Sequence, residues 1–224
     1  MELLLQSFFN LDILKQAWPF LLSGFWMTVK LTLVVVPLGL AGGLAVALLS
    51  TARSRAVRWT LIVYVDFFRA FPPLVLLMFI AFGVPFLGID LGAFAAVALS
   101  FLLNTSSYYG EIFRAGIESI GSGQMEAARS TGLTRAQAMI HVVIPQATRN
   151  VLPDLVGNTL EVVKLTSLAS VVALPELLYA ARSAQSITYN PSPIVLAAAI
   201  YLVLLWPGVR LLSRLEHRML VSHR

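Results

Sequence analysis

The stretch Glu126-Ala-Ala-Arg-Ser-Thr-Gly132, followed by Val142-Val-Ile-Pro145, is a polar, arginine-bearing segment in an otherwise apolar sequence. A charge is costly inside lipid, so this segment is expected to lie outside the hydrocarbon core of a membrane. The small side chains of Ala127 and Ala128 would let a partner approach closely, and Glu126 offers a charge for an ion pair. The spacing alone leaves two interpretations open, a docking site for a second protein and an ordinary connecting loop.

Helix start and stop signals divide this segment in two. Ser122 is the expected N-cap of a helix that runs to about Thr131, and Gly132 can supply the left-handed residue that ends it. Thr134-Arg-Ala-Gln137 fits a capping box that begins a second helix, which Pro145 is expected to end. The sequence therefore predicts a helix, a turn at Gly132 and a second helix.

The composition indicates an integral membrane protein. Hydrophobic residues make up 58% of the 224 residues and charged residues 12%, whereas a soluble domain needs about 25% charged residues to cover a surface that faces water. Cysteine is absent, which excludes disulfides and cysteine-based metal or redox sites. The net charge of +5 comes from dispersed basic residues, so we expect no nucleic-acid partner. His141, His217 and His223 lack the spacing of metal ligands, so we expect no metal site.

Five apolar stretches are long enough to cross a membrane, because a spanning helix needs about 20 mainly apolar residues. They are Phe20–Ser50, Val57–Phe82, Leu91–Tyr109, Val151–Ala181 and Pro193–Leu212. In the first stretch, Gly39, Gly43 and Ala47 form a smooth stripe for close helix packing. Residues 1–19 lack a basic leader and a cleavage site, so they suit a short helix at the membrane interface rather than a removable signal peptide.

The distribution of arginine decides the topology. Arginines follow the first, third and fifth stretches, within 53–58, 114–149 and 210–224, whereas the loop 83–90 has no lysine or arginine. Basic loops stay on the cytoplasmic side, so all three clusters lie inside only if the fourth stretch, which charged residues interrupt, also crosses. The prediction is one all-α integral membrane domain, residues 1–224, with about five spans, the N-terminus outside and the C-terminus inside.

The polar segment resembles the EAA loop of ABC importer permeases, whose pattern is E-A-A, three residues, G, nine residues, then I-x-L-P. The residues that match it are Glu126, Ala127, Ala128, Gly132 and Pro145, with Val142 and Ile144 as conservative replacements. Further segments resemble the polar-amino-acid group of that family, in order along the chain. These segments are Phe68–Val75, Tyr108–Ile117, Ile144–Ala147, Leu152–Pro153 and Lys164–Leu168.

The resemblance implies a type I ABC importer permease fold and a permease subunit that forms half of the membrane pathway of an ATP-driven amino-acid importer. Its partners would be a dimer of ATPase subunits, a second permease that is identical or homologous, an extracytoplasmic amino-acid-binding protein and membrane lipid. The expected location is the cytoplasmic (inner) membrane of a prokaryote.

The resemblance also implies how the ATPase would be engaged. The loop 118–146 would carry the coupling helix, and the coupling residues would be Glu126, Ala127, Ala128, Gly132 and Pro145. The chain contains no G-x-x-x-x-G-K-[ST] phosphate loop, so we expect it not to be an enzyme. ATP and magnesium would bind the partner ATPase, and this chain would bind no cofactor.

Charged and hydroxyl side chains within the predicted spans are the candidates for a solute pathway. Glu161 and Lys164 lie three residues apart and could either neutralise one another or bind the two charges of an amino acid. Thr166 and Ser167 add hydroxyl groups, and by resemblance this segment lies beside the solute path. Leu165 stands where many family members carry a polar or acidic residue, so this subunit could be the less engaged half of a heterodimer.

Two further pairs of opposite charge have the same spacing. Arg69 is a pathway candidate, but Asp66 lies three residues before it, and an internal ion pair or an anchor at a helix break is the favoured interpretation. Glu111 and Arg114 are expected to form a structural ion pair near the polar segment.

Other classes of function remain possible on the sequence alone. A secondary transporter or channel would use the charged groups of the spans as ion or proton sites, but five spans fit poorly with inverted repeats. An intramembrane enzyme would need a nucleophile–base pair or a metal set, and no histidine lies within a predicted span. A membrane scaffold would tolerate loss of the intramembrane charges, whereas a transporter should not.

Overall fold

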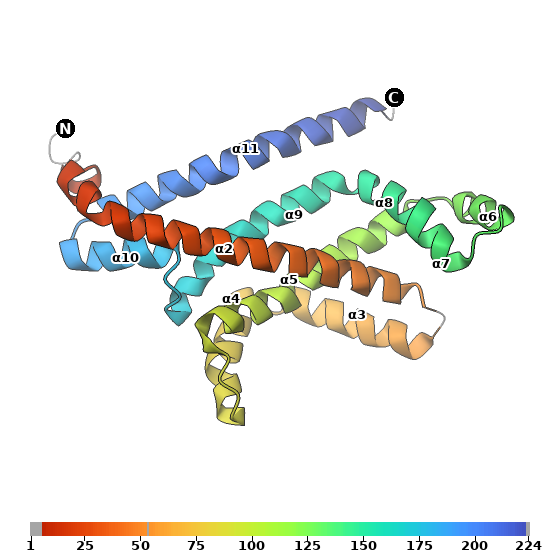
Figure 1. The fold of residues 1–224 in the computed structure, drawn as a ribbon, viewed down its shortest axis with the longest axis horizontal. Coiled ribbons are helices and arrows are strands. Elements are labelled where there is room, and N and C mark those ends of the chain that lie inside the picture. Colours follow the sequence, from red (N-terminus) through yellow and green to blue (C-terminus); the bar gives the residue numbers. More distant parts are fainter. Residues whose placement is uncertain (1–5, 53, 223–224) are drawn as a thin grey trace. The chain divides into compact units, whose positions relative to one another are not determined.

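The computed structural model describes residues 6–52 and 54–222, and every regular element among them is a helix (Figure 1). The longer helices are α2 (Leu11–Ser50), α3 (Arg55–Ala70), α5 (Gly92–Glu118), α9 (Leu152–Leu165), α10 (Leu177–Thr188) and α11 (Ser192–Ser222). The shorter helices are α4 (Pro73–Met78), η1 (Phe79–Gly83), η2 (Val84–Leu87), α6 (Ser122–Ser130), α7 (Arg135–Ala138), η3 (Met139–Val143), α8 (Ile144–Asn150) and η4 (Thr166–Val172).

The chain divides into two compact units. Unit 1 comprises Met1–Pro37, Pro72–Phe101 and Leu160–Leu211, and unit 2 comprises Leu38–Phe71, Leu102–Thr159 and Leu212–Arg224. Helices α2, α5, α9 and α11 each contribute one part to each unit.

Length and composition identify the membrane-spanning elements. Three helical segments of the described chain are long and apolar enough to cross a membrane: Gln6–Ser50, Leu152–Val172 and Ser192–His217. The bent pair Arg55–Ala70 and Pro73–Leu87 adds a fourth if it is one broken span. These spans and the helical content confirm the predicted all-α membrane fold.

The predicted third span, 91–109, is the first part of α5, which is long enough to cross but less apolar than the others. Its polar run is buried inside the protein, with Asn104, Thr105, Ser106 and Ser107 all at most 3% exposed. These side chains face other helices rather than lipid, and hydropathy therefore understates how well α5 suits a membrane.

Two predicted boundaries differ from the structure. Helix α2 begins at Leu11 rather than near Phe20, because the Asn10 carboxamide oxygen accepts the N–H groups of Asp12 and Ile13 at 3.1 and 3.2 Å. Residues 11–19 of the predicted interfacial segment are thus continuous with the first span, and residues 1–5 lie outside the described part. The fourth span ends at Val172 rather than Ala181, since Ala173 adopts a left-handed conformation with φ of 56°.

The core of unit 1 joins α2, α10 and α11. Its buried members are Ala17, Leu21, Leu177, Ala181, Ala184 and Ala197. At Gly24 of α2, an added Cβ would lie 2.8 Å from the carbonyl oxygen of Glu176, so only glycine allows this approach. Small residues thus let the helix backbones of unit 1 lie close together.

The core of unit 2 uses the small-residue stripe predicted on the first span. A Cβ on Gly43 would lie 2.8 Å from the backbone nitrogen of Gly110, and Ala47 is 1% exposed. Gly39 faces Thr105 and Tyr109 of α5 in the same way. The stripe is confirmed as the contact between α2 and α5.

Candidate functional site

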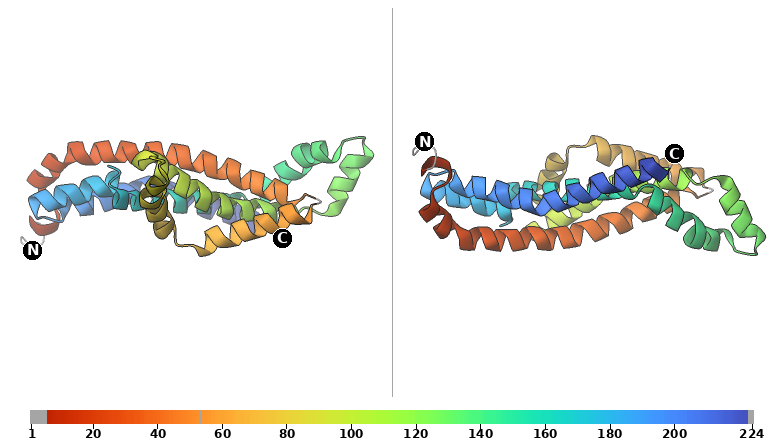
Figure 2. Two further views of the ribbon diagram at one scale, coloured as in Figure 1. Left: turned by 90° about the horizontal axis from the view of Figure 1, so that it is seen from below. Right: turned by 90° about the horizontal axis from the view of Figure 1, so that it is seen from above.

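The polar segment folds as the predicted helix, turn and helix (Figures 1 and 2). Gly132 has φ of +91° and ends α6, while its N–H donates to the Arg129 carbonyl at 3.1 Å. The capping box at Thr134 is present: the Gln137 N–H donates to the Thr134 hydroxyl at 3.3 Å, and the Thr134 N–H donates to the Gln137 side-chain oxygen at 2.9 Å. Short-range hydrogen bonds therefore determine the shape of this loop.

Two details of that prediction are wrong. Gly121 is the N-cap of α6 and Ser122 its first residue. Pro145 does not end the second helix, because the chain continues through the π-helical turn η3 into α8 and ends at Asn150. A π-turn breaks the i→i−4 hydrogen-bond pattern, which accommodates a residue without an N–H. The same order recurs in unit 1, where η1 precedes Pro85.

The exposed side of the loop differs from the one that the sequence suggested. Glu126 and Ala127 are exposed, but Ala128 is 7% exposed, and Ala138 and Val143 of the second helix are buried as well. Helix α6 contacts α7 and η3, so the buried Ala128 is less open to a partner than Glu126 and Ala127. Ile140 is 55% exposed and adds an apolar side chain to the surface of the loop, at a position that the EAA pattern does not include.

The second half of the loop is attached to the end of α5. At Gly116 an added Cβ would lie 3.0 Å from the Ala147 carbonyl oxygen, so α8 and α5 touch through their backbones. The Asn150 amide donates to the Ser119 hydroxyl at 2.9 Å. A displacement of α8 therefore acts directly on α5.

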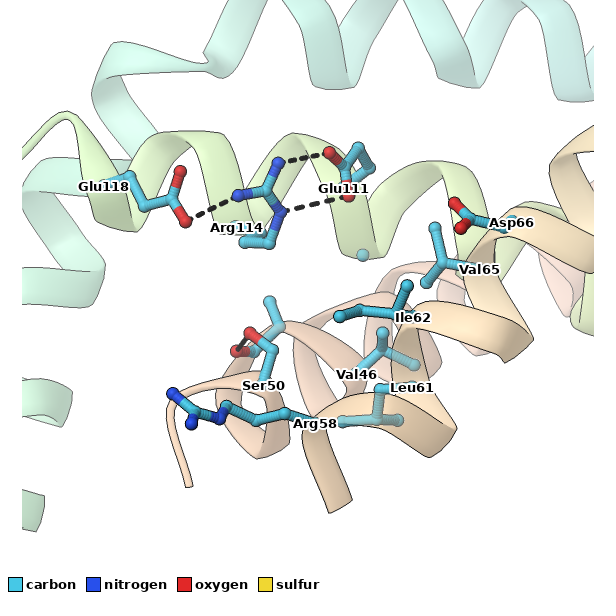
Figure 3. A pocket seen from close by; sticks show the side chains of 12 residues that line it. Val46, Ser50, Arg58, Leu61, Ile62, Val65, Asp66, Glu111, Arg114 and Glu118 are labelled. Carbon is cyan, nitrogen blue, oxygen red and sulfur yellow. Dashed lines mark hydrogen bonds and ion pairs between the residues drawn. The ribbon is translucent and has the colours of Figure 1, made fainter. Parts of the chain in front are cut away.

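The same end of α5 carries a cluster of charges that lines a cavity of about 450 Å³ (Figure 3). Arg114 bonds Glu111 through Nε at 3.1 Å and Glu118 through Nη1 at 2.5 Å. The hydrogen bond from Arg114 is the largest influence on Glu111 and lowers the pKa of its carboxyl group. The ion pair predicted between Glu111 and Arg114 is confirmed.

The ion pair predicted between Asp66 and Arg69 is absent from the described side chains. Asp66 lines the cavity beside Glu111, whereas the Arg69 guanidinium lies over the Tyr108 ring, 5.5 Å from its centroid. The Tyr108 hydroxyl donates to the Arg69 carbonyl at 3.3 Å. Aromatic contact thus replaces the expected salt bridge and joins α3 to α5.

The other solute-pathway candidates lie on consecutive turns of α9 and η4 in unit 1, whereas Arg69 belongs to unit 2. Lys164 and Glu161 form an ion pair of 2.5 Å, with side chains 50% and 63% exposed. Thr166 is fully buried and donates to the Val163 carbonyl at 2.6 Å, and Ser167 donates to the Lys164 carbonyl at 2.8 Å. The charged pair is therefore the most exposed of these candidates, Ser167 is partly exposed, and Thr166 is closed to a ligand.

A buried carboxylate that the sequence analysis did not single out lies where η4 gives way to α10. Glu176 is fully buried, and its oxygens accept the N–H groups of Leu178 and Tyr179 at 2.8 and 2.7 Å and the Tyr201 hydroxyl at 3.1 Å. The Leu177 N–H donates to the Thr28 hydroxyl at 3.1 Å. We call Thr28, Glu176 and Tyr201 the Glu176 cluster. The one available signal was an acidic residue within an apolar run.

Comparisons with known proteins show which family, relatives and solved structure this chain is similar to. The family model "Binding-protein-dependent transport system inner membrane component" matches residues 39–221. The "Probable glutamine ABC transporter permease protein GlnM" of Bacillus subtilis is 34% identical over 215 residues, 96% of this chain and 100% of that protein. The "Arginine transport system permease protein ArtQ" of the same organism is 34% identical over 188 residues, 83% and 86% of the two chains. A solved structure, "Crystal structure of an amino acid ABC transporter with histidines", has a TM-score of 0.82 at 37% identity and covers 92% of this chain and 96% of its own.

Proposed function

Because this chain belongs to the family of binding-protein-dependent transport system inner membrane components, and is thus a permease subunit of an ABC importer, we propose that it forms half of the membrane pathway for an amino acid. A separate subunit hydrolyses ATP in this family, and this chain has no phosphate loop. The observation that carries the proposal is the exposed helix–turn–helix of Ser122–Asn150, which is attached to α5.

The loop has the properties of a coupling element. Coupling requires that the two states of the ATPase contact the permease differently, and that the contact moves a membrane helix. Glu126, Ala127 and Ile140 offer an exposed contact surface, with Gly132 as the joint and Pro145 within the continuous second helix. Ala147 and Asn150 would pass a displacement of this surface to α5.

The complex would contain further subunits and a fixed orientation. The arginines that follow the first, third and last spans favour a cytoplasmic loop and C-terminus, with the N-terminus outside. A second permease, an ATPase dimer that holds ATP and magnesium, and an extracytoplasmic binding protein would complete the importer in the inner membrane of a prokaryote.

The solute would be an amino acid, which two observations support. The relatives are named for glutamine and for arginine at equal identity, so similarity favours the class without selecting a member. Glu161 and Lys164 are exposed and carry the two charges that an amino acid needs opposite its own. Since they also neutralise one another, a bound solute would have to replace their ion pair.

Co-purification tests the proposal. The tagged chain is isolated from its host in a mild detergent, and its partners are identified by mass spectrometry. We expect an ATPase with a phosphate loop, which is lost from the eluate when Glu126→Lys and Ile140→Asp are combined. A chain that purifies alone, and that moves amino acids in liposomes without ATP, would be a secondary transporter instead.

A further inference from the structure

Two arginines at the start of α3 have no acidic partner among the described side chains. Arg55 and Arg58 lie one helical turn apart, both are exposed, and neither takes part in any of the ion pairs of the described side chains. Arg58 lines the same cavity as Glu111, Arg114 and Glu118, but in Figure 3 no dashed line joins it to them. The two guanidinium groups are therefore available to an anion.

An aromatic and then an apolar surface follow these arginines along the same helix. Trp59 is 67% exposed and lines, together with Arg55, Arg58 and Ile62, a hollow of about 430 Å³. Farther along α3, Val63 is 62% exposed. We call Arg55, Arg58, Trp59 and Ile62 the α3 arginine face. Its order of charge, indole and aliphatic side chain matches the order of phosphate, interface and acyl chain in a phospholipid.

We propose that the α3 arginine face binds one phospholipid with an anionic headgroup. The planar guanidinium groups of Arg55 and Arg58 donate to phosphate oxygens, a geometry that arginine favours over lysine. The acyl chain lies along Ile62 and Val63, which are 49% and 62% exposed.

Charge complementarity and the membrane setting favour lipid over a protein partner. An acidic protein surface would match the two arginines alone, whereas one anionic phospholipid places its phosphate at the arginines and its acyl chain along Ile62 and Val63. Lipid binding needs only this chain and no other subunit. The statement that the lipid comes from the cytoplasmic leaflet rests on the proposed topology.

Native mass spectrometry of the full chain, or of its complex, tests the site. The purified protein is titrated with phosphatidylglycerol and, separately, with phosphatidylethanolamine. One arginine near an anionic membrane surface changes binding about fivefold, so we expect Arg55→Gln with Arg58→Gln to weaken phosphatidylglycerol binding about 30-fold. The charge-matched control, Arg182→Gln with Arg210→Gln, removes two guanidiniums from different helices and should change binding less than threefold.

Other outcomes would overturn the site. Equal retention of phosphatidylglycerol by the double variant and the control, or tighter binding of phosphatidylethanolamine than of phosphatidylglycerol, contradicts it. Loss of the ATPase or of the second permease from the double variant, with lipid retained, would assign the face to a protein partner. Lipid binding is measured without transport, so a chain that keeps the lipid but carries no amino acid would contradict the proposed function alone.

Variants with lysine keep the test informative if the glutamine variant folds poorly. Arg55→Lys with Arg58→Lys preserves the charge but not the planar donor geometry. We expect an intermediate loss, about three- to tenfold, with an unchanged thermal unfolding midpoint.

Discussion

The loop Ser122–Asn150 and the Glu176 cluster satisfy their polar groups in opposite ways. The loop relies on neighbours in sequence, such as the capping box in which Thr134 and Gln137 are three residues apart, and its Gly132 faces open space. In the cluster, Leu177 reaches Thr28 across 149 residues and Glu176 reaches Tyr201 across 25 residues. A locally defined region can change without unfolding its surroundings, whereas a cluster assembled from distant elements cannot.

The largest effect is expected from Glu176→Ala. It leaves the N–H groups of Leu178 and Tyr179 and the Tyr201 hydroxyl without an acceptor inside the protein, which should cost about 3 kcal/mol or more. The thermal unfolding midpoint of the detergent-solubilised chain should fall by roughly 6–12 °C. Fluorescence-detected size-exclusion chromatography after heating measures this midpoint.

Two variants make that measurement specific. Glu176→Gln keeps an acceptor oxygen and should recover about half of the lost stability. Glu216→Ala removes an exposed carboxylate from α11 and should shift the midpoint by no more than about 2 °C. A midpoint for Glu176→Ala within error of that control would show that the cluster contributes nothing to stability.

The next effect tests close packing in unit 2 with a single added carbon. In Gly43→Ala the new Cβ meets the backbone of Tyr109 and Gly110 at 2.8 Å, so we expect a loss of about 1–3 kcal/mol. Gly83→Ala is the matched control, because its Cβ would touch only the Phe79 ring at 3.8 Å and above. Equal unfolding midpoints for the two variants would contradict the helix contact described for α2 and α5.

Gly132→Val tests the loop, where the effect on stability should be smaller than the effect on transport. No atom lies within 4 Å of the added Cβ, so the cost is the strain of φ at +91°, on the order of 1 kcal/mol and confined to the turn. We expect normal membrane insertion, with ATP hydrolysis no longer linked to uptake in proteoliposomes. Gly123→Val adds the same side chain in open space without positive φ and should leave uptake nearly unchanged.

The smallest effect concerns pH at the end of α5. The pKa of Glu111 is lower in the folded protein than in the unfolded chain, so its contribution to stability is fully present above the unfolded pKa of about 4.3. That contribution is lost as the pH falls through the folded pKa. The difference in unfolding midpoint between wild type and Arg114→Gln should therefore be constant from pH 7 to about pH 5.5 and shrink below about pH 4. A difference that grows on acidification would contradict the ion pair.

The same contrast explains which features could be predicted. Caps and turns depend on residues within about four positions, so the roles of Gly132 and Thr134 were correctly identified. Small residues at four-residue spacing lie on one face of a helix, so the stripe of Gly39, Gly43 and Ala47 was also identified. The boundary errors at Pro145 and Ala173 arose where the backbone departs from a regular α-helix: the π-helical turn η3 carries the chain past Pro145, and the left-handed conformation of Ala173 ends the fourth span without a glycine. The roles of the coupling and pathway residues stay predictions.

The sequence by itself determined that the chain is a helical membrane protein, that its polar loop is a helix, turn and helix, and that it has no phosphate loop. Hydropathy and short-range hydrogen bonds suffice for these features, since each depends on composition or on near neighbours. Only the tertiary structure decided that Ala128 faces inward and that Arg69 contacts Tyr108 instead of Asp66. It also decided that Glu176 bonds Tyr201 of α11, while the neighbouring Leu177 bonds Thr28 of α2. These contacts link residues far apart in the chain, and no local sequence pattern specifies which distant side chain will lie against a given residue.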